Sequence, residues 1–131
     1  MVLGYNTPSV NIHWDEPPHM RMQHHLLLLR AHAHENALWV GAAAKCGRED
    51  GHHMFGGSCI VSPAGEIVAL AASEDDEVIS ASCDLALGDP FRRHIFNFEH
   101  HRRPEHYRLI VERSGAGAPL GRPGELDRPQ H

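Results

Sequence analysis

The spacing of apolar positions in the first third of the chain predicts a strand followed by a helix. Residues 2–5 (VLGY) have the character of a strand end, and the Asn-Thr-Pro-Ser stretch after them is typical of a loop. From residue 15 to residue 35, apolar side chains recur at intervals of three and four, which places them on one helical face. These side chains are Met22, Leu26, Leu29 and Ala33. The Asp-Glu-Pro-Pro segment at 15–18 predicts a helix start under an acidic cap, and Asn36 predicts its end.

The pattern then changes from helical spacing to short apolar runs. The continuous run at 37–44 (ALWVGAAA) favours a strand covered on both faces. Residues 45–55 are polar and contain glycine, so we expect a loop there. Two further short strands are predicted at 58–62 and 66–71, joined by a Pro-Ala-Gly turn at 63–65.

The remaining third predicts weaker elements. Alternation over 77–84 favours a strand, and Asp89 with Pro90 can cap a short helix over 91–98. The segment 114–131 is rich in Gly and Pro with few large apolar residues, which predicts a disordered tail. We therefore expect one folded unit over 1–113, which suits a chain of 131 residues.

Composition narrows the function classes. The formal net charge of −5 gives no electrostatic case for binding nucleic acid or an anionic membrane. The Leu run at 26–29 is too short to cross a bilayer, and residues 1–10 lack the pattern of a signal peptide. We expect a cytoplasmic protein that binds neither nucleic acid nor membrane.

Histidine is unusually frequent, at 13 of 131 residues. A helical metal site needs two histidines at positions i and i+4 with a further ligand nearby, and no pair between residues 20 and 35 has that spacing. We predict no metal cofactor, with a histidine-rich metal binder as the less favoured alternative.

The three cysteines form no CxxC pair, which favours free thiols in a reducing compartment. Cys59 and Cys83 lie in strand patterns, and free cysteine is among the most buried residue types, so we predict a structural role for both. Cys46 lies in the predicted loop, and its role stays open. No cysteine is placed where a helix N-terminus or a base would activate it.

Five stretches together resemble one family in order and spacing. The family is the carbon–nitrogen hydrolases (nitrilase superfamily), and the most similar branch is the N-carbamoyl-D-amino-acid amidohydrolases. The stretches are GYNTP (4–8), HHLLLLRAHAHENALWVGAAAKCG (24–47), SCIVSPAGEIVAL (58–70), DEVISASCDL (76–85) and HIFNFEHHRRPEHY (94–107). The first and last point to the carbamoylase branch.

The resemblance implies an α/β fold, the four-layer α-β-β-α sandwich, of which this chain holds the C-terminal part. It also implies a small-molecule substrate, an N-carbamoyl amino acid or related amide, and a homo-oligomeric enzyme without metal or organic cofactor. In the family a cysteine thiolate attacks the carbonyl-type carbon, a glutamate acts as base and a lysine stabilises the intermediate.

None of these three catalytic residues matches a position in this chain. Cys59 and Lys45 fall at other places in the pattern, so we assign no catalytic residue and expect the chain alone to be inactive. The resemblance places Asn6 and Thr7 where the carbamoylase branch contacts the substrate carboxylate. Two interpretations follow: a split or truncated hydrolase that needs its N-terminal half, or a non-enzymatic assembly module derived from the fold.

Overall fold

The computed structural model describes residues 1–11, 13–108 and 110, arranged in two compact units. The first unit, Met1–Asn97, contains both β-sheets, and the second begins at Phe98. In the second unit, the described elements are two short helical segments, α3 (Phe98–His101) and η2 (Pro104–His106). The predicted tail at 114–131 lies outside the described residues.

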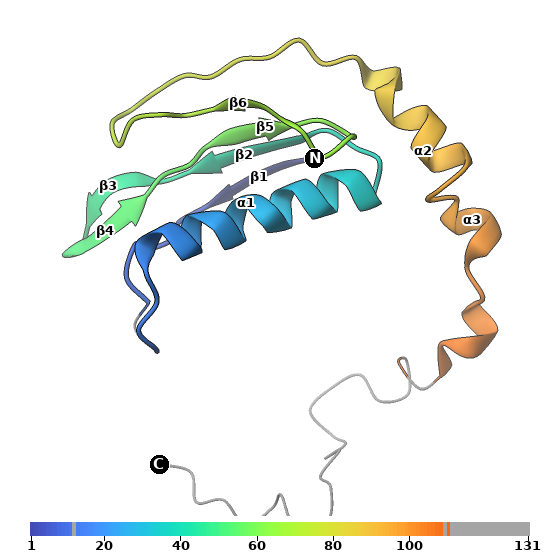
Figure 1. Ribbon diagram of the computed structural model, residues 1–131, viewed down its shortest axis with the longest axis horizontal. Helices are drawn as coiled ribbons and strands as arrows, with labels where there is room; N and C mark the ends of the chain where they lie inside the picture. Colours follow the sequence, from blue (N-terminus) through green and yellow to red (C-terminus); the bar gives the residue numbers. More distant parts are fainter. Residues whose placement is uncertain (12, 109, 111–131) are drawn as a thin grey trace, which may run out of the picture. The chain divides into compact units, whose positions relative to one another are not determined.

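A four-stranded sheet with one long helix on its face forms the centre of the first unit (Figure 1). Its strand order is β1-β2-β5-β6, and the helix is α1 (Pro18–Glu35). The strands are β1 (Val2–Tyr5), β2 (Val40–Ala44), β5 (Cys59–Val61) and β6 (Ile67–Leu70). β1 and β2 are parallel, so α1 is the crossover that parallel neighbours require, and the other pairs are antiparallel. The predicted strand–helix–strand–hairpin order is confirmed.

The core lies between α1 and the sheet. Leu29 and Ala33 of the helix are buried against alternate residues of β2 and β5, namely Val40, Ala42, Cys59 and Val61. Because alternate strand residues point to the same face, this packing explains why the helical stripe and the apolar strands belong together. The predicted apolar face of the helix is confirmed at its two buried positions.

The two ends of α1 differ in how well they were predicted. The helix starts beside Pro17, and no side chain caps it. The expected acidic cap is therefore wrong, because the Glu16 carboxylate turns instead to Asn11, Arg21 and His24. The end is confirmed: the Asn36 side-chain amide donates to the His32 carbonyl oxygen at 3.0 Å.

Residues 45–55 form a hairpin, so the predicted loop is wrong. Strands β3 (Cys46–Glu49) and β4 (His52–Phe55) pair antiparallel in a second, two-stranded sheet. Asp50 and Gly51 at its tip both have positive φ, 50° and 84°. Such a pair matches the right-handed twist of the flanking strands, which is why Asp-Gly favours two-residue hairpins.

The predicted 63–65 turn is confirmed and is fastened to α1. The Gly65 amide donates to the Ser62 carbonyl oxygen at 2.9 Å, and the buried Ser62 hydroxyl accepts from two turn amides. Arg30 of the helix donates to the Gly65 carbonyl oxygen at 2.8 Å. The turn therefore holds the β5–β6 hairpin against the helix.

The segment 77–84 is not a strand in the described structure. Its first residue, Glu77, instead accepts hydrogen bonds from the Ser73 amide and hydroxyl and from the Ala72 amide. These bonds lower the pKa of the Glu77 carboxyl, with the Ser73 bonds as the largest cause. The carboxylate closes the 72–77 turn.

Beyond this segment the chain forms η1 (Leu85–Gly88) and α2 (Asp89–Arg93). The short helix is confirmed, but Asp89 and Pro90 are its first residues rather than its cap, and it ends at Arg93 rather than at residue 98. Gly88 lies so close to the end of α1 that an added Cβ would stand 2.2 Å from the Ala37 carbonyl oxygen. Only glycine fits there, and Arg92 completes the contact by donating to the same oxygen at 2.8 Å.

Candidate functional site

The loop that follows β1 is held as a strand-like extension alongside the β3–β4 hairpin. The Phe55 amide donates to the Thr7 carbonyl oxygen at 3.3 Å, and the Ser9 amide donates to the His53 carbonyl oxygen at 2.7 Å. Pro8, between them, forms an isolated antiparallel bridge with Met54. The hairpin therefore fixes the backbone of the segment in which Asn6 and Thr7 lie.

Arg21, on the second turn of α1, holds the same loop from the helix side. Its Nε donates to the Pro8 carbonyl oxygen at 2.7 Å, and its Nη1 donates to Glu16 Oε2 at 3.1 Å. The Arg21 and Glu16 side chains are only 16% and 11% exposed. A guanidinium donates several hydrogen bonds in fixed directions, so this residue can hold the loop and a carboxylate together.

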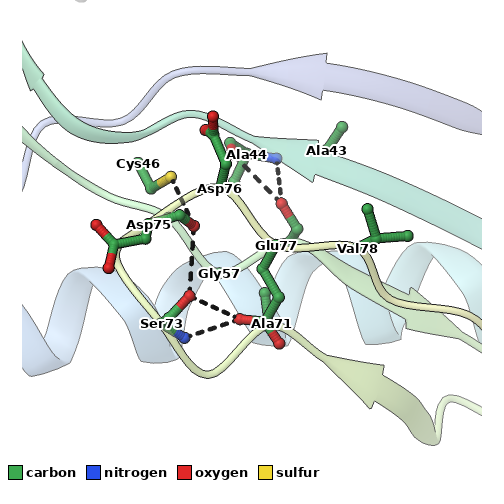
Figure 2. A pocket seen from close by; sticks show the side chains of 12 residues that line it. Ala43, Ala44, Cys46, Gly57, Ala71, Ser73, Asp75, Asp76, Glu77 and Val78 are labelled. Carbon is green, nitrogen blue, oxygen red and sulfur yellow. Dashed lines mark hydrogen bonds between the residues drawn. The ribbon is translucent and has the colours of Figure 1, made fainter.

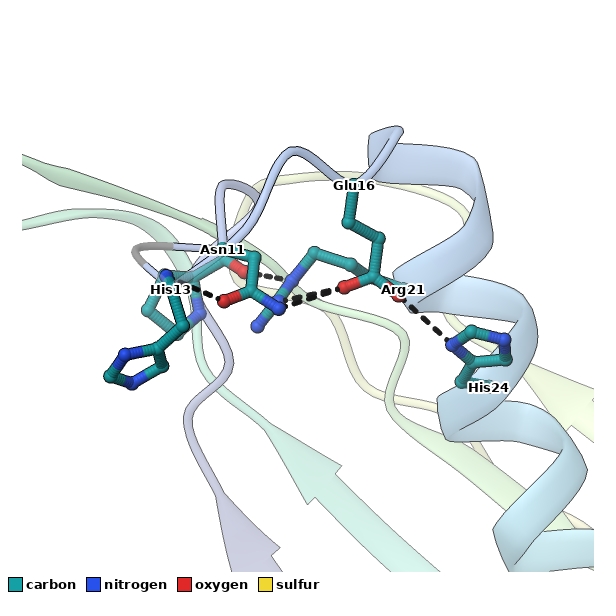
Figure 3. Close-up of polar contacts among 6 residues, drawn as sticks. Asn11, His13, Glu16, Arg21 and His24 are labelled. Carbon is teal, nitrogen blue, oxygen red and sulfur yellow. Dashed lines mark hydrogen bonds and ion pairs between the residues drawn. The ribbon is translucent and has the colours of Figure 1, made fainter. Parts of the chain in front are cut away.

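Glu16 is the centre of a wider polar network (Figure 3). Besides Arg21, it accepts from Asn11 Nδ2 at 3.1 Å and its other oxygen lies 3.0 Å from His24 Nδ1. The Asn11 hydrogen bond, followed by the Arg21 bond and charge, lowers the pKa of the Glu16 carboxyl. Glu16 is therefore ionised at neutral pH.

A cavity of about 440 Å³ opens beside this network. Its lining combines a hydroxyl, an ion pair, imidazoles and two exposed apolar side chains. The lining residues are Thr7, Asn11, His13, Trp14, Glu16, Arg21, His24, His25 and Leu28. Concave sites that mix an apolar wall with a few convergent polar groups are typical of small-molecule binding.

His25 lines this cavity, and its hydrogen-bond partner Tyr5 lies outside the lining. The Tyr5 hydroxyl and His25 Nε2 are hydrogen-bonded, and the Tyr5 hydroxyl lies 3.3 Å from the Gly57 carbonyl oxygen. Burial lowers the pKa of His25, and burial together with nearby Cys59 raises that of Tyr5. Both side chains are uncharged at neutral pH, so His25 borders the cavity as a neutral imidazole.

The structure separates the two residues that the resemblance singled out. Thr7 lines the cavity, whereas Asn6 is exposed and is not among the lining residues. Sequence reasoning missed Arg21, Glu16 and His25. The available signal was spacing, because His24 and His25 follow Arg21 by three and four positions and so share its helical face.

The cysteines differ from one another in their surroundings. Cys59 is 1% exposed in β5, and burial raises the pKa of its thiol, which agrees with the predicted structural role. Cys83 is exposed, so its predicted place on a buried strand is wrong, because the segment 77–84 does not pair. Lys45, which the sequence analysis compared with the catalytic lysine of the family, forms an ion pair with Glu49.

Cys46 lies in β3, not in a loop, and borders a second cavity of about 390 Å³ (Figure 2). Its Sγ donates to the Asp75 carbonyl oxygen at 3.4 Å. The cavity's ionisable neighbours are Asp75, Asp76 and Glu77, and no imidazole lines it. The cavity therefore offers Cys46 no imidazole that could act as a base.

Among the described residues, no three His, Cys, Asp or Glu side chains converge as a metal site would require. Within the same residues, no helix is long and apolar enough to span a membrane.

Comparison with known proteins decides the family. The carbon-nitrogen hydrolase family model matches residues 5–93. This range contains α1, the strands β2 to β6 and all the residues that line the cavity beside Thr7. The chain belongs to the carbon-nitrogen hydrolase family. The resemblance to this family that was read from the sequence is confirmed at the level of the family.

Individual relatives give the same assignment. This carbon-nitrogen hydrolase chain is 41% identical over 92 residues to a deaminated glutathione amidase of Rattus norvegicus, covering 67% of this chain and 27% of that protein. It is 32% identical over 103 residues to an N-carbamoylputrescine amidase of Oryza sativa subsp. japonica, covering 71% and 33%.

A solved structure confirms the fold class. The carbon-nitrogen hydrolase from Helicobacter pylori G27 superposes with a TM-score of 0.67 at 25% identity, over 84% of this chain and 39% of that chain. The α/β class is thus confirmed, with this chain carrying part of the family fold. The matched part of this chain spans only about a quarter to a third of the length of the curated relatives.

Proposed function

We propose that this chain provides part of the substrate-binding wall of a hydrolase that acts on N-carbamoyl amino acids or related amides. In this proposal Thr7 donates its hydroxyl hydrogen to the substrate carboxylate from the cavity lining, and the side-chain amide of the neighbouring Asn6, which is exposed outside that lining, donates a second hydrogen bond. The observation that supports it is the cavity beside Thr7. The backbone of the loop that carries Thr7 is held on one side by β4 and on the other by Arg21. Because the loop is already ordered, binding an anion there does not carry the entropy cost of ordering it.

The substrate class follows from the family branch that the GYNTP and HIFNFEHHRRPEHY stretches resemble. The name of one relative, N-carbamoylputrescine amidase, includes the carbamoyl group. Cleavage of an N-carbamoyl amino acid gives ammonia, carbon dioxide and the free amino acid.

The reacting groups in this proposal are a cysteine thiolate, a glutamate base and a lysine that come from polypeptide outside these 131 residues. Within the chain, Cys59 is buried under α1, and Lys45 is paired with Glu49. Neither side chain lines the cavity beside Thr7. We therefore expect the chain to act only within an assembled enzyme and without a metal or organic cofactor.

The test is complementation. The chain is co-expressed with the N-terminal part of a carbamoylase that carries the cysteine, glutamate and lysine segments, and ammonia release from N-carbamoyl amino acids is measured. We expect turnover by the pair, and a KM that rises roughly 10- to 100-fold for Thr7→Ala, because a hydrogen bond to a charged group is lost.

Thr7→Ser is the matched control and keeps the hydroxyl, so it should retain most of the affinity. Two outcomes contradict the proposal: turnover by the 131-residue chain without its partner, or a Thr7→Ala variant with an unchanged KM.

A non-enzymatic assembly module is the second candidate, and one observation favours it. Leu27 on α1 is 57% exposed and lines a separate cavity together with Met22, Leu26 and Ile67. Apolar side chains gathered at the surface in this way are typical of sites that pack against another protein. This alternative predicts association through α1 without turnover.

A further inference from the structure

Three side chains from separate segments form a continuous hydrogen-bonded chain outside the cavity beside Thr7. Ser9 Oγ lies 3.0 Å from His53 Nδ1, and His53 Nε2 lies 2.9 Å from Glu74 Oε2. Ser9 belongs to the loop after β1, His53 to β4 and Glu74 to the turn after β6. The arrangement of hydroxyl, imidazole and carboxylate is the one by which enzymes activate a serine.

The carboxylate decides which nitrogen of His53 carries the proton. An ionised carboxylate only accepts hydrogen bonds, so Nε2 must hold the hydrogen that points at Glu74. In a neutral imidazole Nδ1 then has its lone pair free, directed at the Ser9 hydroxyl. His53 is thus placed as a general base for Ser9, with the two ring nitrogens exchanged relative to the serine proteases.

The backbone holds this geometry in place. The Ser9 amide donates to the carbonyl oxygen of His53 at 2.7 Å, so the two residues are joined by main chain as well as by side chain. The His53 side chain is 34% exposed and that of Glu74 67% exposed, and Ser9 is half-buried. A small reagent can therefore reach the hydroxyl, while the base is fixed beside it.

We propose that Ser9 is a base-activated nucleophile that accepts an acyl or phosphonyl group from small activated esters. Ser9 Oγ attacks the carbonyl carbon while its proton passes to His53 Nδ1. The carbon–oxygen bond to the leaving alcohol then breaks, and the alcohol takes that proton, which leaves acyl-Ser9. Water, deprotonated by His53, later releases the carboxylic acid and restores the hydroxyl. With a fluorophosphonate the oxygen–phosphorus bond forms, fluoride leaves and the proton goes from His53 to solvent.

The test uses the full 131-residue chain and a biotin-tagged fluorophosphonate, with peptide mass spectrometry to locate the adduct. We expect the adduct on Ser9 and its loss in Ser9→Ala. His53→Gln should slow labelling roughly 100-fold, because it removes the general base. Ser80→Ala, at an exposed serine without an imidazole partner, should label like the unchanged chain.

Glu74 is a positioning residue. Substituting it distinguishes activation of Ser9 through His53 from a purely structural contact between Glu74 and His53. Glu74→Gln should slow labelling about 10-fold, since the amide no longer fixes the tautomer, and Glu74→Asp should restore part of the rate. Because this side chain is mostly exposed, the fold should survive, which circular dichroism checks. Equal labelling of several serines, or a Ser9 rate unchanged by His53→Gln and Glu74→Gln, would overturn the proposal. The assay contains no carbamoyl compound, so its result is independent of the proposed function.

Discussion

At the scale of single residues, burial separates the reactivity of the three thiols. Cys59 is packed between α1 and the sheet, whereas Cys83 is exposed and Cys46 is intermediate. Burial raises the pKa of the Cys59 thiol, so it is protonated at neutral pH as well as shielded from reagents. Cys59 therefore acts as a small apolar side chain.

We predict that a maleimide modifies Cys83 first and Cys59 only when the chain unfolds. Native-state labelling of Cys59 should be slower by about 100-fold or more, since it requires opening of the core. Peptide mass spectrometry over a time course, with and without denaturant, measures the rates. Cys83→Ser should remove the fast phase alone. Modification of Cys59 at the rate of Cys83 would show that this core is not formed in solution.

At the scale of elements, the β3–β4 hairpin orders the candidate site. It supplies the backbone partners of Thr7 and Ser9, so the cavity beside Thr7 depends on a unit that lies some 45 residues further along the chain. The hairpin in turn depends on its tip, where Gly51 has a φ of 84°. A β-branched residue is strongly disfavoured at such an angle.

Gly51→Val should destabilise the hairpin by about 1–2 kcal/mol. Hydrogen exchange at the Phe55 and Ser9 amides should accelerate, because these two amides join the hairpin to the loop: Phe55 donates to the Thr7 carbonyl oxygen, and Ser9 donates to the His53 carbonyl oxygen. Asp50→Asn is the matched control, since asparagine also tolerates positive φ. Exchange rates that are the same in both variants would mean that the tip does not control the loop.

An element could be predicted from the sequence when neighbouring residues alone determine it. The α1 stripe and the 63–65 turn follow from neighbouring residues, and both are confirmed. The β3–β4 hairpin also had a local signal, Asp50-Gly51, which the polar composition of 45–55 concealed. The segment 77–84 has strand-like alternation, but strand formation needs a partner edge, which no local pattern specifies.

The candidate site was less predictable than the fold for the same reason. Thr7 came from a family resemblance, and its place on the cavity wall could be expected. Arg21 and Glu16 could not, because Arg21 has its role through a hydrogen bond to the Pro8 carbonyl oxygen, and Glu16 has its role through contacts with Asn11, Arg21 and His24. These are contacts between segments, and the residue types alone do not determine them.

At the scale of the whole first unit, apolar surface remains exposed on both layers. Leu27 is exposed on α1, and Val2 and Val68 are 87% and 43% exposed on the edge strands β1 and β6. Edge strands with free backbone groups and apolar side chains favour pairing with other chains. We therefore expect the chain by itself to associate rather than to remain a monomer.

Sedimentation velocity at several concentrations should show this association, and Leu27→Glu should weaken it by placing a charge in the contact. Gln23→Glu, one turn earlier on α1, adds the same charge at an already polar position and should have little effect. A compact monomer at every concentration would contradict the expectation.

The bond between Arg21 and the Pro8 carbonyl oxygen has a mechanical consequence. It ties the loop to a helix that packs into the core through Leu29 and Ala33, so the loop cannot move outward while that bond lasts. A ligand that enters the cavity beside Thr7 would therefore contact a preformed lining, and its size and shape would determine whether it fits.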